Sequence, residues 1–160
     1  MVVWYVGLSV LAVHYIFRSS GIDYRLVAAG SILPLLADLP LRRLAYGHTL
    51  VVGVALLVVV MLGTIGRTRL LRRRLLCLPI GYFCGLALSG AWAAGDLFWW
   101  PFTGGTIPHE PLLPPIGIVL LEELAGLAAC AWIVVRFGLA DGAARRAFLR
   151  TGRLREVARA

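Results

Sequence analysis

The sequence is poor in cysteine and has no segment that resembles a flexible linker. Its three cysteines, Cys77, Cys84 and Cys130, lie in or beside apolar segments and form neither a CxxC pair nor a zinc-finger spacing. This spacing argues against a cysteine-based zinc site and a disulfide framework, so we interpret the cysteines as small apolar packing residues. No Ser/Pro-rich stretch and no internal repeat divides the chain, which indicates one principal domain.

Lysine is absent and acidic residues are few. All 16 basic residues are arginine, against eight aspartates and glutamates, and the isoelectric point is near 10.4. In a soluble protein this charge would suggest a nucleic-acid partner. Here the arginines cluster in short stretches between apolar runs, a pattern typical of membrane orientation, so we do not expect nucleic acid as a partner.

Apolar residues dominate the chain. They make up 60% of it, with a mean hydropathy of +0.86, which exceeds what a soluble domain of 160 residues can bury. Five apolar segments are predicted to be helices, because a helix satisfies its own backbone hydrogen bonds in hydrocarbon. They cover residues 2–17, 26–36, 49–65, 75–94 and 116–137. The predicted fold is therefore all-α, an integral membrane bundle of about five transmembrane helices.

The orientation of the chain depends on whether the second segment, 26–36, spans the membrane. This segment contains Gly30 and Pro34, and both a span and a re-entrant element are compatible with it. If all five segments span, 14 arginines fall on one side and only Arg42 and Arg43 on the other. The positive-inside rule then predicts a protein of the bacterial cytoplasmic membrane with its N-terminus outside and its C-terminus in the cytoplasm.

The C-terminal stretch, 143–160, combines arginines with scattered apolar residues. This combination predicts a basic amphipathic helix that lies against anionic lipid at the cytoplasmic surface. We therefore divide the chain into a transmembrane helical domain, 1–142, and a cytoplasmic tail, 143–160.

Ionisable side chains inside apolar segments are the candidates for chemistry, because each is costly in hydrocarbon without a partner or a task. Asp38, His48, Asp96 and Glu122 are all predicted to lie in the outer layer of the bundle. Asp38, His48 and Glu122 are candidate ligands of a divalent metal such as zinc, and Asp38 and His48 are candidate catalytic residues. The alternative is structural: the two carboxylates pair with the neighbouring arginines of the outer side, and His48 caps a helix.

Several short motifs occur in a recognisable order. They are Gly30-Ser31-Ile32-Leu33-Pro34, Asp38-Leu39-Pro40, Gly47-His48-Thr49-Leu50 and, after Trp92, Phe98-Trp99-Trp100-Pro101-Phe102. In their order and spacing, residues 14–104 resemble the bacterial LexA-binding, inner-membrane-associated metal-dependent hydrolases. That resemblance implies a helical membrane protein whose family carries Pro-Asp-x-x-Asp, His-Thr-Leu and His-x-x-x-Asp elements.

The chain departs from this family at three polar positions. Leu35 stands at the first aspartate, Gly85 at the later histidine and Ser89 at its partner aspartate. Only Asp38 and His48 remain of the set that the resemblance implies. A hydrolytic zinc takes three protein ligands and one water, so the metal-ligand set is incomplete.

Gly81, Gly85, Ser89 and Ala93 recur at every fourth residue of the segment 75–94. This stripe predicts a small-residue seam against which another helix packs closely. It favours a packing or scaffold subunit of a membrane assembly, with the lipid bilayer and another membrane protein or a second copy as partners. The alternative is an active membrane-embedded hydrolase, whose metal would activate water for attack on a lipid-like ester or phosphoester at the outer face.

Overall fold

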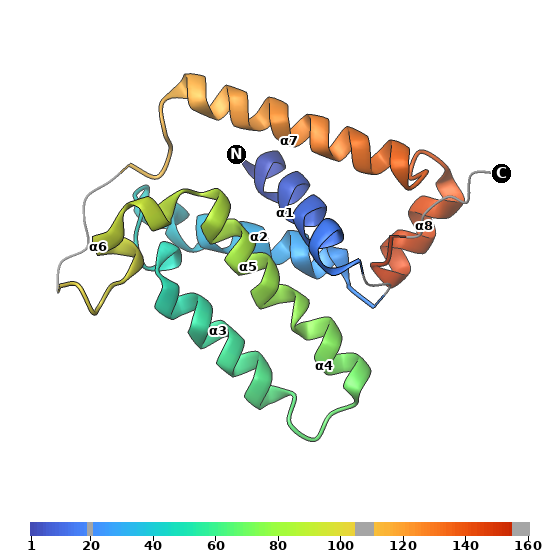
Figure 1. Ribbon diagram of the computed structural model, residues 1–160, viewed down its shortest axis with the longest axis horizontal. Coiled ribbons are helices and arrows are strands. Elements are labelled where there is room, and N and C mark those ends of the chain that lie inside the picture. The colour runs from blue at the N-terminus through green and yellow to red at the C-terminus, as the bar shows by residue number, and fades with distance from the viewer. Residues whose placement is uncertain (19–20, 105–110, 155–160) are drawn as a thin grey trace.

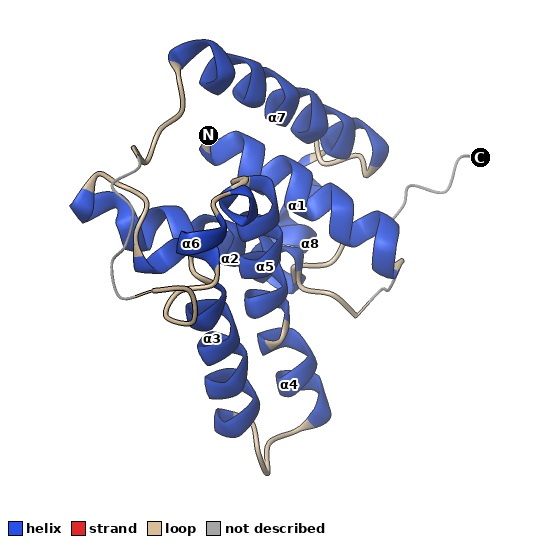
Figure 2. Ribbon diagram, turned by 60° about the vertical axis from the view of Figure 1, so that its left-hand side comes forward, coloured by secondary structure: helices blue, strands red, loops and turns tan. Residues whose placement is uncertain are grey.

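The computed structural model describes residues 1–18, 21–104 and 111–154, and this part of the chain contains helices and no strand (Figure 2). The all-α prediction is thus confirmed for it. The helices are α1 (Val2–Phe17), α2 (Tyr24–Asp38), α3 (Leu50–Gly63), α4 (Arg69–Leu75), α5 (Cys77–Leu88), α6 (Gly95–Phe98), α7 (Ile116–Arg136) and α8 (Gly142–Thr151). Three short 3-10 turns accompany them: η1 (Leu39–Leu41), η2 (Tyr46–His48) and η3 (Ala91–Ala93).

Local sequence explains where the helices begin and end. The N-cap Asp23 starts α2 by accepting a hydrogen bond from the backbone N–H of Arg25, and Pro34 lies inside this helix without ending it. The predicted helix over 75–94 is wrong in its extent. Leu76 separates α4 from α5, and Gly90, with a φ of +70°, turns the chain into η3 after α5 has ended.

The bundle is organised around α2, which packs most extensively against α5, while α1 contacts α2, α5 and α7 (Figure 1). Its buried apolar side chains form two clusters. The larger contains Val10, Val13, Tyr24, Val27, Cys77, Ile133 and Phe137, and the smaller contains Tyr5, Leu35 and Leu112. The long helices are thus held together at both ends of α2.

The two ends of the bundle differ in charge. In Figure 1, α4, α8 and the C-terminal end of α7 lie toward the right, whereas α6 lies toward the left. Arginines are concentrated on α4 and α8, while Arg42 and Arg43 follow η1 at the opposite end of α2. The two groups of arginines that the sequence separates therefore lie at opposite ends of the folded chain. The arginines of α4 and α8 lie at one end, and Arg42 and Arg43 lie at the other.

Two of the described helical stretches are long and apolar enough to cross a membrane. They are Tyr24–Leu41, with a mean hydropathy of 1.3, and α7, with a mean hydropathy of 2.1. The helices α1 and α3 are apolar but shorter. Only 17% of the apolar window of α7 is buried, whereas the core helix of a soluble protein is mostly buried. Length and composition thus identify two membrane-compatible helices, fewer than the five expected.

The beginning of the C-terminal stretch is docked on the bundle. Arg25 Nη1 donates a hydrogen bond of 2.6 Å to the carbonyl oxygen of Leu149, and the backbone N–H of Tyr24 donates one of 2.8 Å to that of Gly152. Phe148 and Leu154 pack against the larger core cluster. The end of α8 is therefore held by the start of α2. The remainder of the predicted tail, 155–160, lies outside the described residues.

Asp23 predicts a pH dependence of this docking. Burial opposes its ionisation, but hydrogen bonds from the Arg25 side chain and backbone and the charges of Arg25 and Arg74 outweigh burial and lower the pKa of Asp23. A lowered pKa stabilises the folded state above the ordinary aspartate pKa, and this contribution is lost as the pH falls through the lower pKa of the folded state. We therefore expect the Tm difference between wild type and Asp23→Asn, measured in detergent, to shrink on acidification.

The control for this experiment is Asp141→Asn, because Asp141 is an exposed N-cap that asparagine can replace. Its Tm difference from wild type should stay small and nearly constant with pH. If Asp23→Asn gave the same flat profile, the Asp23 carboxylate would contribute nothing to docking.

Candidate functional site

Asp38 and His48 form a buried polar pair at the end of α2. Asp38 Oδ2 lies 2.7 Å from His48 Nδ1, and both residues are 1% exposed. The same oxygen accepts a 2.7 Å hydrogen bond from the backbone N–H of Ala45, and Asp38 Oδ1 accepts one of 2.8 Å from Gly47. The carboxylate therefore has three donors, as a buried carboxylate requires.

Three elements position this pair. The C-terminal end of α2 supplies Asp38, and η2, which directly precedes the N-cap of α3, supplies His48. From α5, the Tyr82 hydroxyl donates a hydrogen bond to the carbonyl oxygen of Gly47. A Cβ on Gly47 would lie 2.6 Å from the carbonyl oxygen of Pro34, so the loop passes α2 too closely for any larger residue.

This arrangement can hold an imidazole in one orientation. A carboxylate that engages Nδ1 sets the tautomer of a histidine, which is useful both for metal binding and for acid–base chemistry. It also satisfies two backbone N–H groups of the loop 39–49, which would be costly if buried without acceptors. The geometry of the pair would suit metal binding or acid–base chemistry. The same carboxylate also stabilises the fold of the loop 39–49.

Glu122 is not brought to this pair. It lies on α7, where it interacts electrostatically with the amino group of Met1, and Glu123 forms an ion pair with that same group. The Glu122 Oε2 atom is buried without a hydrogen-bond partner among the described residues. No group of three or more His, Cys, Asp or Glu side chains suited to a metal occurs in the described part of the chain. The proposed set Asp38, His48 and Glu122 is thus not assembled, because α7 packs on α1.

The other residues considered for the outer layer also lie elsewhere. Asp96 is exposed on α6, and the ion pairs expected between Asp38 or Glu122 and Arg42 or Arg43 do not occur among the described residues. Instead, the carboxylate of Asp38 points inward to the donors of its own loop. The N-cap of α3 is Thr49, so His48 does not cap that helix.

The small-residue seam lies between α5 and α2 of the same chain. A Cβ on Gly81 would lie 2.1 Å from the carbonyl oxygen of Val27, and one on Gly85 would lie 2.3 Å from that of Ser31. From the other side, a Cβ on Gly30 would lie 2.1 Å from the carbonyl oxygen of Leu78. These three glycines allow backbone-to-backbone contact that any side chain would prevent.

The predicted stripe is shorter than four residues because α5 ends at Leu88. Ser89 is the C-cap, where its hydroxyl donates to the carbonyl oxygen of Leu86, and Ala93 lies in η3. A hollow of about 300 Å³ follows, and no ionisable side chain lines it. Its lining residues are Leu44, Ser89, Gly90, Ala91, Ala93 and Ala94.

A second glycine contact, not predicted from the sequence, joins α1 to α7. A Cβ on Gly126 would lie 2.4 Å from the backbone nitrogen of Trp4, and one on Gly7 would lie 2.7 Å from the carbonyl oxygen of Gly126. The signal in the sequence is Gly7 in one apolar segment and Gly126 in another, without a glycine repeated at every fourth residue.

Comparison of the chain with protein families, with curated proteins and with solved structures found no match.

Gly81→Ala tests whether the α2–α5 contact holds the fold together. The new methyl group would collide with the backbone of α2, so we expect a loss of roughly 1–3 kcal/mol in the free energy of unfolding, as for other overpacked sites. The measurement is chemical denaturation in detergent. The matched control is Gly63→Ala on α3, where nothing lies within 4 Å of the added Cβ. That variant should be neutral or slightly more stable, and equal effects of the two substitutions would contradict the proposed role.

Proposed function

We propose that this chain is a multi-span protein of the bacterial cytoplasmic membrane that acts as a packing subunit of a membrane assembly. The observation that carries the proposal is the difference between the inward faces of its helices, which carry glycines, and the outward faces, which carry large apolar side chains. Glycine contacts join the helices inside the chain, while large apolar side chains of α3 and α7 face outward.

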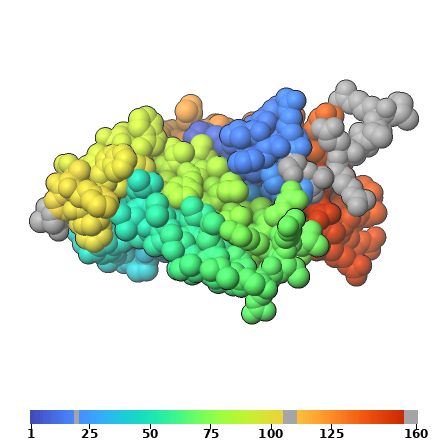
Figure 3. Space-filling view, turned by 60° about the horizontal axis from the view of Figure 1, so that its bottom comes forward, coloured from blue at the N-terminus to red at the C-terminus, as the bar shows by residue number. Residues whose placement is uncertain are grey.

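The outward faces are too apolar for contact with water alone. Val59 and Leu62 on α3 are 66% and 61% exposed, and Leu121 and Val135 on α7 are 71% and 82% exposed. Figure 3 shows α3 and α4 covering much of one face of the molecule. Such exposed apolar side chains are suited to contact with acyl chains or with a helix of another membrane protein.

The path of the chain supports five crossings. In Figure 1, α1, α2, α3, the consecutive α4 and α5, and α7 run back and forth between the arginine-rich end and the end that carries α6. At 1.5 Å per residue the 16 residues of α1 extend about 24 Å and the 14 of α3 about 21 Å, so both need flanking residues to reach across about 30 Å of hydrocarbon. The positive-inside rule places the arginine-rich end in the cytoplasm.

Packing is favoured over hydrolysis because the described residues bring together only two of the groups that a hydrolytic metal needs. The glycine seam is occupied by α2. The outward faces of α3 and α7 are therefore left for a partner helix or a second copy, and α7 is held to the bundle through one narrow face around Gly126 and Ala129. The cytoplasmic tail adds contact with anionic lipid.

One observation favours the second candidate, a metal-dependent hydrolase of the membrane. The Asp38–His48 pair has the carboxylate–imidazole geometry that orients a metal ligand or a general base. On this alternative, a zinc ion held partly by His48 would act on a lipid-like ester or phosphoester at the outer face, and a further ligand would have to come from outside the described residues, from the substrate or from a partner.

The topology is tested with single cysteines introduced into a variant that lacks the native cysteines. We expect Thr103→Cys to react with a membrane-impermeant maleimide in intact spheroplasts, because it follows α6 at the end assigned to the outside. Gly66→Cys, between α3 and α4, should react only after permeabilisation. The reverse pattern would contradict the orientation, and labelling of both from outside would contradict the single span, α4 with α5, that separates them.

Metal content separates the two candidate functions. For a packing subunit we expect well under one zinc or manganese ion per chain in protein purified without chelator, measured by mass spectrometry of the metals. The hydrolase alternative requires about one ion per chain that is lost in His48→Ala and kept in Asp96→Asn, an exposed carboxylate away from the pair. That result would overturn the packing proposal.

A further inference from the structure

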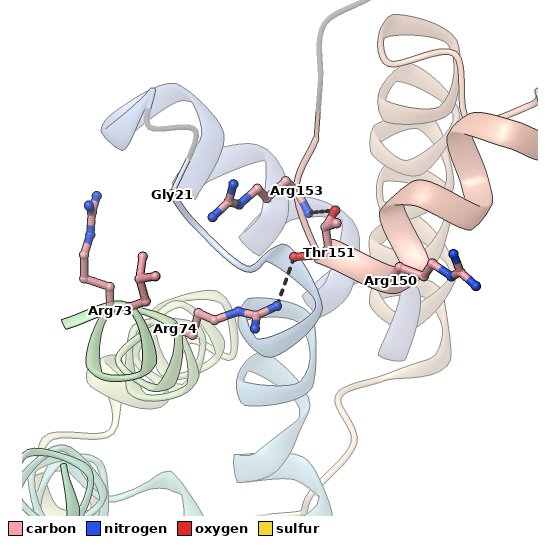
Figure 4. Close-up of a pocket in the computed structure, with 7 residues that line it drawn as sticks. Gly21, Arg73, Arg74, Arg150, Thr151 and Arg153 are labelled. Carbon is pink, nitrogen blue, oxygen red and sulfur yellow. Dashed lines mark hydrogen bonds between the residues drawn. The ribbon is translucent and has the colours of Figure 1, made fainter. Parts of the chain in front are cut away.

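A hollow lined by arginine lies between α4 and the end of α8 (Figure 4). Its volume is about 430 Å³. Its lining residues are Gly21, Leu70, Arg73, Arg74, Arg150, Thr151 and Arg153. Four of these seven residues carry a permanent positive charge, and they come from parts of the chain that are distant in sequence.

The side chains of three arginines lie around this space. In Figure 4, Arg73 and Arg74 both extend from α4, and Arg74 reaches the backbone at Thr151. Arg153 extends toward this side of the hollow from the segment after α8. Arg74 Nη2 donates a hydrogen bond of 3.4 Å to the carbonyl oxygen of Thr151, which holds the two walls together. The guanidinium of Arg73 lies against Gly21, where an added Cβ would be 2.8 Å from Nη2.

The carboxylates of the described residues balance little of this charge. Asp23 lies 3.5 Å from Arg74, but its closer partner is Arg25, at 2.9 Å, so one carboxylate serves two guanidinium groups. Within the described residues, Arg73, Arg150 and Arg153 take part in no ion pair. Several guanidinium groups held close together without anions repel one another, and a bound anion would relieve that repulsion.

The donors suit a phosphate group. A guanidinium presents a planar pair of N–H donors that matches two oxygens of a phosphate, and two or three of them can surround a doubly charged phosphomonoester. Leu70, which is 66% exposed, gives the rim of the hollow an apolar side. A ligand with a phosphate at one end and an apolar part beside it would therefore meet both kinds of surface.

We propose that Arg73, Arg74 and Arg153 form a binding site for a phosphomonoester group. The group belongs either to an anionic lipid of the cytoplasmic leaflet or to a soluble phosphorylated ligand, since both present the same oxygens. The site lies away from the glycine seam and from the Asp38–His48 pair, so phosphate binding is independent of the packing function, and only the assignment to the cytoplasmic leaflet rests on the proposed orientation.

The experiment measures binding to the purified full chain in neutral detergent, with phosphatidic acid and inorganic phosphate as separate probes and phosphatidylcholine as the zwitterionic control. We expect phosphatidic acid to bind with measurable affinity in native mass spectrometry. Arg73→Gln and Arg153→Gln should each weaken that binding at least about five-fold, because each removes a charged bidentate donor. Arg153→Lys should be intermediate, since it keeps the charge and loses the paired donors.

Matched controls separate a defined site from diffuse attraction to positive charge. Arg72→Gln on α4 and Arg146→Gln on α8 remove one charge each outside the hollow, and binding should change less than about two-fold. Equal losses in all four glutamine variants, or no binding of either probe, would overturn the proposal. Binding of phosphatidic acid alone identifies a lipid source, and competition by inorganic phosphate identifies a soluble one. The Tm of each variant without probe identifies losses that come from unfolding.

Discussion

The close contact between α2 and α5 is the constraint on which the other features of this protein depend. Gly30, Gly81 and Gly85 let the two backbones touch, and α2 then delivers one aspartate to each end of the bundle. Helix α5 contributes to both ends too. The Cys77 sulfur accepts a hydrogen bond from the backbone N–H of Asp23, and Tyr82 holds the loop beside Asp38. Separating these helices would disturb both sites at once.

The two aspartates of α2 have opposite surroundings and therefore opposite roles. Asp23 lies among arginines, where its charge fastens the start of α2 to α8 through Arg25 and Arg74. Asp38 lies in the interior with a histidine and two backbone donors, and no arginine reaches it in the described part of the chain. A buried carboxylate is stable only with such donors, so the loop after α2 is folded around it.

The candidate site could be predicted only in part from the sequence. Asp38 and His48 are ten positions apart across a short loop, so their proximity follows from local chain geometry. Glu122 was assigned to the same layer by its depth along a helix, but depth does not specify the direction in which a side chain faces. Packing on α1 turned α7 so that Glu122 meets the amino group of Met1.

Composition and periodicity by themselves determined that this chain is helical and that its helices are apolar. They also separated Arg42 and Arg43 from the other 14 arginines, which fall on the opposite side of the predicted spans. These are local properties, since each depends on residues close together in the sequence. Only the tertiary structure decided that the glycine seam is filled by the chain's own α2, that Glu122 lies near Met1 and not beside Asp38 and His48, and that Arg74 and Arg153 line the same hollow beside α8. Such contacts depend on how helices far apart in sequence rotate and pack against one another, which no single segment specifies.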